Sequence, residues 1–452
     1  MKTALFIYLS LYVAALILIS WVISRKEGDE GFLIANRDRK WWIIASSQFA
    51  GAIGVGYFVA YTGYAYEYGF GVYLILLGSV IGYSLFGLWA AARLYKDSRE
   101  QAFYTQGDYV KFATKSEISK HTVNIVANII LFGWLLIGVV GGAKIISYFG
   151  LMSYEFALLA TVLVVMSYIL IAGFKAVLAT DVFQSFIILI LVALLVWVVT
   201  NSNGVNLGEI LDAQTGKVDI ATAIGFLIFG ILSVFSLPNF YQLVYAGKDK
   251  KEVRRGITTS IIPIVFVATL LLMVGMYMFT ISPGLDSGLV FLEALRLNLP
   301  SYLLPFGILL FFAGLMSSAD TNIYSISSHY VLSRNSKRPV HDIRTATVIL
   351  CILSIIVGFF FRDLIDITIV VAALNIILSP AMIYLIAGGK NSYRFMGSIV
   401  GGIIGLILGL IFIGIEPVLI LPILFGNLIG LIYNGWFIKR KEESVLMSPE
   451  LN

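Results

Sequence analysis

The chain has 452 residues, of which 59% are hydrophobic and only 13% are charged, and its mean hydropathy is +0.93. This composition excludes a soluble globular domain and predicts a membrane protein with many spans. The net charge of +5 is too small to suggest nucleic-acid binding, the single cysteine excludes an intrachain disulfide, and the three scattered histidines do not suggest a metal site.

Apolar runs of about 20 residues predict thirteen membrane-spanning helices. They cover residues 4–24, 41–65, 71–94, 122–146, 153–172, 180–200, 220–246, 256–281, 301–330, 345–361, 366–388, 395–414 and 416–437. The first run is too long for the apolar region of a signal peptide, and no small-x-small cleavage site follows it. We therefore expect it to be retained as a span.

Positive charge is distributed unevenly over the segments between these runs. When the N-terminus is placed outside, 26 of the 31 Lys and Arg residues fall in cytoplasmic segments. This asymmetry follows the positive-inside rule, so it predicts an outer N-terminus and a cytoplasmic C-terminus in the inner (cytoplasmic) cell membrane. The outer loops and the tail after residue 437 are too short to fold as separate soluble domains.

Two of the predicted spans contain residues that interrupt helices. Span 41–65 has three glycines near its middle, Gly51, Gly54 and Gly56. These glycines either allow close helix packing or loosen the helix, which a membrane tolerates only beside protein or a wet cavity. Five spans later Pro238 interrupts span 220–246, where it removes a backbone donor. Interruptions at corresponding positions of two halves indicate a transporter site near the middle of the bilayer.

Because the two interrupted spans are five spans apart, they cross the membrane in opposite directions, which predicts that the halves are inverted copies. We expect a first five-helix repeat at 41–200 and a second, inverted repeat at 220–388. An N-terminal helix and cytoplasmic loop (1–40) precede them, and two extra helices with a cytoplasmic tail (395–452) follow. The predicted fold is thus an all-α integral membrane protein.

Hydroxylated residues form a stripe along span 301–330. They recur with helical spacing and are Ser317, Thr321, Ser325 and Ser328. Each alone is explained by a bond to its own backbone, but the whole stripe lies beside Asp320. Asp181 lies near the start of span 180–200, where a carboxylate either caps the helix or has a function. Hydroxyls, carboxylates and freed carbonyls are the hard oxygen ligands that suit sodium.

Five segments resemble motifs of the sodium:solute symporter family, the relatives of the bacterial proline, sialic acid and galactose transporters. In chain order they are EGFLIANRDRKWW, SSQFAGAIGVG, GFKAVLATDVFQSF, QLVYAGKDKKEVRRG and AGLMSSADTNIYSISS. The resemblance covers nearly the whole chain. It implies a leucine-transporter-type core of inverted five-helix repeats, with unwound first and sixth core helices and extra helices at both ends. It also implies that sodium entry drives solute uptake by alternating access.

The resemblance further implies a sodium site between the first and eighth core helices. Its ligands would be the backbone carbonyls of Ser46, Phe49 and Gly314 and the hydroxyls of Ser317 and Ser318. Asp181 matches the aspartate near which some family members hold a second sodium ion.

The solute pocket departs from the better-known members of the family. Gln48 stands where the proline transporter has an aspartate, and span 122–146 lacks the central arginine that would capture sialic acid. The segment GVYLILLG lacks the polar groups that would grip a sugar. We therefore expect a small, fairly apolar pocket. Its expected lining is Gln48, Ala50, Ile53, Tyr57, Asn239, Phe240 and Asn375.

These features together predict a sodium-coupled importer of a small organic solute, such as an amino acid or a short organic acid, and not an enzyme. The expected partners are sodium, the solute and the lipid bilayer, with no cofactor, no nucleic acid and no obligate protein partner. The alternative is a proton-coupled symporter of the same fold that uses Asp181 or Asp320. An intramembrane aspartyl protease is disfavoured because no GxGD-type segment is present, and a sensor is disfavoured by the short tail.

Overall fold

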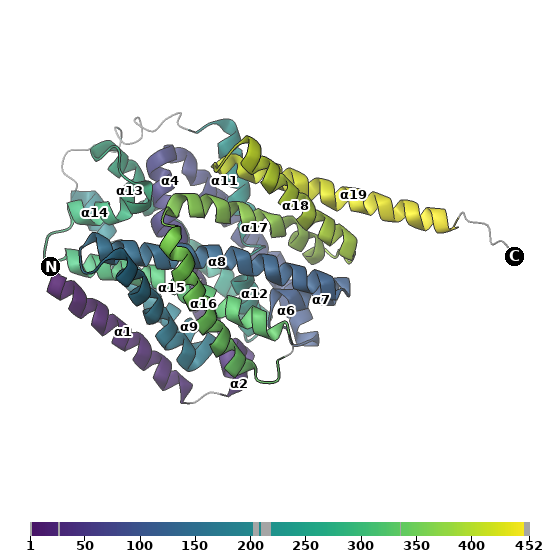
Figure 1. Ribbon diagram of the computed structural model, residues 1–452, viewed down its shortest axis with the longest axis horizontal. Helices are drawn as coiled ribbons and strands as arrows, with labels where there is room; N and C mark the ends of the chain where they lie inside the picture. Colours follow the sequence, from purple (N-terminus) through teal and green to yellow (C-terminus); the bar gives the residue numbers. More distant parts are fainter. Residues whose placement is uncertain (1, 26–27, 202–207, 209–217, 335, 447–452) are drawn as a thin grey trace.

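The computed structural model describes residues 2–25, 28–201, 208, 218–334 and 336–446, and within these ranges it is a bundle of helices (Figure 1). The described part contains no strand beyond an isolated bridge between Arg39 and Gly247. This architecture confirms the predicted all-α class.

Eighteen α-helices and the π-helical segment η2 make up most of the described chain. Their bounds are α1 Lys2–Ser24, α2 Asp29–Ile34, α3 Trp41–Ala52, the π-helical segment η2 Ile53–Tyr61, α4 Thr62–Tyr68, α5 Tyr73–Leu85, α6 Ala91–Glu100, α7 Gln106–Thr114, α8 Glu117–Tyr148, α9 Tyr154–Asn201, α11 Ile220–Ser233, α12 Pro238–Ala246, α13 Lys250–Ile281, α14 Val290–Asn298, α15 Leu304–Leu332, α16 Pro339–Phe360, α17 Leu364–Ile386, α18 Ser392–Phe412 and α19 Ile420–Leu446.

The predicted count of thirteen spans is not confirmed. By length and composition, eleven helices of the described chain are suited to cross a membrane. By that criterion residues 56–100 form one run, although α4 ends at Tyr68 and α5 begins at Tyr73, after a break at Gly69 with a φ of +65°. Of the predicted last span, the apolar part whose side chains are described is Pro417–Tyr433, and the side chains of residues 434–437 lie outside the described set.

Helix α9 is broken at one residue, Gly173, whose φ of +58° and ψ of −143° are not helical. A side chain there would be strained by the positive φ, and its Cβ would lie 2.6 Å from the ring of Phe32. The residues after the break are helical, so the predicted loop at 173–179 is not a loop. Asp181 consequently lies well inside a helix, which rules out the alternative that it caps a helix start.

The two predicted helix interruptions are both present. Between α3 and α4, Gly54 has a non-helical ψ of −116° within η2. Residues 234–237 separate α11 from α12, and Pro238 is the first residue of α12, a position where a missing N–H costs nothing. Each interruption leaves backbone groups in the interior of the bundle, where they can contact an ion or a solute.

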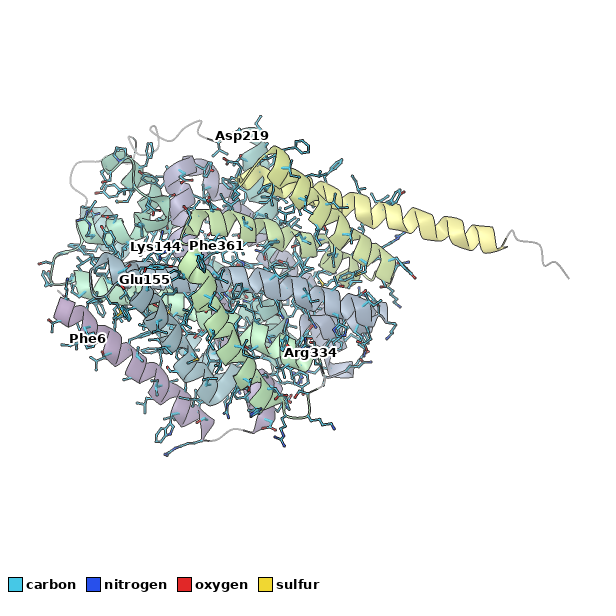
Figure 2. The ribbon with its side chains drawn as sticks, viewed as in Figure 1. Phe6, Lys144, Glu155, Asp219, Arg334 and Phe361 are labelled. Atoms are coloured by element: carbon cyan, nitrogen blue, oxygen red, sulfur yellow. The ribbon has the colours of Figure 1, made fainter. Side chains whose placement is uncertain are left out.

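Helix α15 is the buried centre of the bundle and packs against α8, α9, α16 and α1 (Figure 1). Its many Gly, Ala and Ser residues allow neighbouring backbones to approach closely. The periphery is apolar instead. Phe6 on α1 points away from the other helices (Figure 2) and is 60% exposed, as expected for a side chain that faces lipid.

Candidate ion and solute sites

Asp181 on α9 is fully buried and connects three helices through its two carboxylate oxygens. The Ser317 hydroxyl of α15 donates to Oδ1 at 2.7 Å, and the Ser47 hydroxyl of α3 donates to Oδ2. In the described part of the chain no basic side chain pairs with Asp181. A buried carboxylate without a cation is costly, so this oxygen-rich point is suited to bind one.

The predicted sodium ligands all lie where the broken helix meets α15. The Ser46 carbonyl accepts a hydrogen bond from Ser185 at 3.0 Å, and that hydroxyl also contacts the Asp181 carbonyl at 2.7 Å. Ser318 donates to the carbonyl of Gly51 at 2.9 Å. The structure therefore brings Ser46, Ser317 and Ser318 into one polar region with Asp181.

The remaining two predicted ligands are backbone carbonyls. The Phe49 carbonyl accepts the N–H of Ile53, as in a regular helix. The Gly314 carbonyl faces the interruption, because a Cβ built on Gly54 would lie 2.6 Å from it. Ser47 was not among the predicted ligands, although its position next to Ser46 in the SSQ motif is a signal for it.

The second buried carboxylate, Asp320, has a separate set of donors. Tyr168 donates to its Oδ2 at 2.8 Å and Thr180 at 3.3 Å, while the Thr321 N–H donates to Oδ1 at 2.6 Å. Asp320 is fully buried and has no contact with water. Its donors tie both halves of α9 to α15, which gives Asp320 a structural role.

Replacing Tyr168 with phenylalanine is expected to lower the stability of the protein by about 2 kcal/mol, because a buried carboxylate loses a hydrogen bond. The measurement is the melting temperature of the purified protein. Tyr302→Phe is the matched control, since Tyr302 is 74% exposed. Equal melting temperatures for the parent and Tyr168→Phe would contradict this role of Asp320.

A cavity of about 140 Å³ lies beside this polar region. It is lined by residues of α3, η2, α4, α5, α8, α9, α11, α12, α15, α17 and α19. Four of the predicted solute residues line it, namely Gln48, Tyr57, Asn239 and Phe240. Ser47 and Ser318 line it as well, so the polar region around Asp181 and the cavity are contiguous.

Three of the predicted solute residues do not line the cavity. Ala50 and Ile53 are fully buried in the core. Asn375 is also buried, and its Oδ1 accepts a hydrogen bond from Ser236 at 3.1 Å.

Aromatic side chains that were not predicted supply much of the cavity wall. They are Tyr61, Tyr64, Tyr83, Trp134, Phe174, Phe226 and Phe229. The spacing of Tyr57, Tyr61 and Tyr64 at i, i+4 and i+7 is the signal in the sequence that could have identified two of them.

The profile of the sodium:solute symporter family matches residues 32–405, which is most of the chain. A curated relative, the sodium/pantothenate symporter of Haemophilus influenzae, is 27% identical over 268 residues. That alignment covers 56% of this chain and 54% of the relative, so the chain spans about half of the relative's length.

Solved structures share the fold. A Na⁺-coupled sialic acid symporter in a substrate-bound, outward-open state has a TM-score of 0.76 at 17% identity, covering 96% of this chain and 98% of the other. Mhp1, a nucleobase-cation-symport-1 family transporter, has a TM-score of 0.62 at 13% identity, with coverages of 91% and 95%. A manganese transporter of Eremococcus coleocola has a TM-score of 0.53 at 12% identity, with coverages of 90% and 97%.

These similarities confirm the leucine-transporter-type fold that was predicted, and the relatives are transporters rather than enzymes. They give no support to the proton-coupled alternative. Because the family profile matches well over half of its length, the chain belongs to the sodium:solute symporter family.

Proposed function

We propose that this protein is a sodium-coupled importer that takes up a small organic solute by alternating access. The observation that carries the proposal is Asp181, which is buried without a basic partner in the described chain and bonded to Ser47 and Ser317. These two serines belong to the interrupted helix and to α15. A sodium ion bound there joins the elements that must move relative to one another.

Sodium acts through the difference between its affinities for the outward-open and inward-open states. Bound near Asp181 and Ser318, it stabilises the arrangement in which α3 lies against α15. The solute then enters the contiguous cavity beside Gln48, and both leave when the cytoplasmic side opens. The predicted repeats at 41–200 and 220–388 are the bodies that we expect to rock against each other.

We propose that the protein lies in the inner (cytoplasmic) cell membrane. In the proposed orientation the N-terminus is outside and the C-terminus is in the cytoplasm. Lys144 and Arg334, which this orientation places outside and inside, lie toward opposite ends of the bundle (Figure 2). The solute classes expected from the sequence are amino acids and short organic acids. Pantothenate and sialic acid, which the names of two relatives mention, belong in the first panel of solutes.

The test is the melting temperature of the purified protein in sodium and in potassium at equal ionic strength. A ligand that binds only the folded state stabilises it by about 2.7 kcal/mol at a hundredfold excess over its dissociation constant. We expect a rise specific to sodium. No difference between the two salts would contradict the proposal.

Ser318→Ala is expected to lower the affinity for sodium at least about tenfold, because it removes one oxygen ligand from the predicted site. The measurement is the sodium concentration that gives half of the maximal rise in melting temperature. Ser333→Ala near the end of α15 is the matched control, since its hydroxyl bonds to the Tyr330 carbonyl. If the Ser318→Ala protein kept the sodium response of the parent, this placement of the ion would be contradicted.

A further inference from the structure

The cavity presents hydrogen-bonding groups that the protein leaves unused. Gln48 is 3% exposed, yet neither its Oε1 nor its Nε2 has a hydrogen-bond partner among the described residues. The same is true of the indole Nε1 of Trp134, the hydroxyl of Tyr61 and the Oδ1 of Asn239. All four side chains line the cavity. Because buried polar groups are nearly always paired in folded proteins, these atoms are suited to pair with a bound solute.

The unused groups are neutral and include both donors and acceptors. Gln48 offers an N–H donor and a carbonyl acceptor side by side, whichever way its amide is turned. Trp134 is a donor only, and Tyr61 can act in either way. A solute that satisfies Gln48 must therefore carry an acceptor next to a donor.

The cavity wall offers no side-chain charge to an ionic solute, and a sodium ion bound beside it would already be balanced by Asp181. Among the cavity-lining residues that the structure describes, none is an acid, a base or a histidine. A carboxylate accepts hydrogen bonds but donates none, so it would leave the Gln48 carbonyl unpaired. An ammonium group would in turn leave the Gln48 amide donors and the Trp134 N–H unpaired. A zwitterionic amino acid could satisfy both ends of Gln48, but it would bury two charges that no lining side chain balances.

The start of α12 could in principle attract an anion, but few of its N–H groups are free. Its first residue is Pro238, which has no N–H. The N–H of Phe240 already donates to the Leu237 carbonyl at 3.2 Å. The helix dipole therefore acts on the cavity without the donors that usually hold an anion.

The walls of the cavity are flat and aromatic. The rings of Tyr83 and Phe240 stack with centroids 5.7 Å apart and an interplanar angle of 29°. Tyr57 and Tyr61 contact each other with centroids 5.0 Å apart. Surfaces of this kind favour a ring that packs against them over a flexible polar chain.

We propose that the transported solute is an uncharged ring compound with an amide-type edge, a carbonyl next to an N–H, which pairs with Gln48 while its ring packs against the aromatic walls. This inference rests on the proposed function, because it names the solute class of the same symport site. Under this inference the solute is neither an amino acid nor an organic acid.

The experiment compares neutral amides with acids of similar shape. The probes are nicotinamide with nicotinate, uracil with orotate, and benzamide with benzoate, and proline represents the amino acids. The melting temperature of the purified full-length protein is measured with each compound in sodium and in potassium. We expect at least one amide to raise the melting temperature in sodium, and its acid partner to have no effect.

Two variants assign the effect to the cavity. Gln48→Leu is expected to weaken binding of the stabilising amide about a hundredfold, since both ends of the amide edge lose their partner. Trp134→Phe keeps an aromatic wall but loses the N–H, so a loss of about tenfold is expected. Gln101→Leu is the matched control, because Gln101 is exposed at the end of α6. Monodisperse elution on size exclusion confirms that each variant is folded.

The outcomes separate this inference from the proposed function. Stabilisation by acids or by proline but not by amides overturns the inference, and so does a sodium effect that no amide enlarges. Unchanged amide binding in both Gln48→Leu and Trp134→Phe overturns it too. An amide that stabilises equally in sodium and in potassium supports the inference and contradicts sodium coupling.

Discussion

Replacing Asp181 with asparagine is expected to lower the affinity for sodium at least about a hundredfold and to abolish sodium-dependent uptake. The substitution keeps the shape of the side chain and removes the charge of the carboxylate to which Ser47 and Ser317 both donate. Breaking a buried ion pair by removing one partner costs roughly 3–5 kcal/mol, which corresponds to a factor of more than a hundred in affinity. The measurement is the sodium dependence of the melting temperature.

The same variant should be at least as stable as the parent in potassium, because it no longer buries a carboxylate that lacks a cation. Asp219→Asn is the matched control, since Asp219 is an exposed helix cap on α11 and asparagine caps equally well. If the Asp181→Asn protein kept the sodium affinity of the parent, Asp181 would not be a ligand of the ion.

The sequence was a good guide to where polar groups would gather, because their cost in a membrane makes them conspicuous. The hydroxylated stripe of α15 was recognised from its spacing alone. In the structure its members meet different partners. Ser317 bonds to Asp181, whereas Ser325 and Ser328 both bond to Gln242. The spacing identifies the polar face of α15. It does not say which helices pack against that face, because those contacts depend on the tertiary structure.

Asp320 shows that neighbours in the sequence need not share bonding partners in the structure. It stands between the stripe members Ser317 and Thr321, yet its carboxylate bonds to Tyr168 and Thr180. These donors come from either side of the Gly173 break in α9. No periodicity within α15 could reveal them, because the contact depends on how the two halves of α9 fold back on α15.

Ile53 lies outside the cavity, contrary to expectation, because the helix break changes the rotational phase. On a continuous helix Ile53 and Tyr57 would share a face, as residues four apart do. Gly54 interrupts the helix between them, so Ile53 is in the core while Tyr57 lines the cavity. A glycine-rich sequence predicts that a break exists but leaves the new direction of the chain undetermined.

Replacing Gly54 with alanine is expected to destabilise the protein by about 3 kcal/mol and to abolish its sodium response. A Cβ at this position would lie 2.6 Å from the Gly314 carbonyl and would also collide with the Ser318 hydroxyl. Overpacking of this kind typically costs about 1–3 kcal/mol, and here one of the colliding groups is backbone that cannot move away by changing rotamer. The clash would push α15 away from η2 at the predicted sodium ligands. The melting temperatures in sodium and in potassium measure both effects.

Gly51→Ala is the matched control for this prediction, since it places the same methyl group one turn earlier in the same interrupted helix. A Cβ there would meet no atom within 4 Å. Alanine is favoured over glycine in a helix by about 1 kcal/mol, so this variant should be as stable as the parent or more stable. Equal losses of stability in Gly51→Ala and Gly54→Ala would show that the glycines serve the flexibility of the helix. A loss confined to Gly54→Ala would show that the close approach of η2 to α15 is what the site requires.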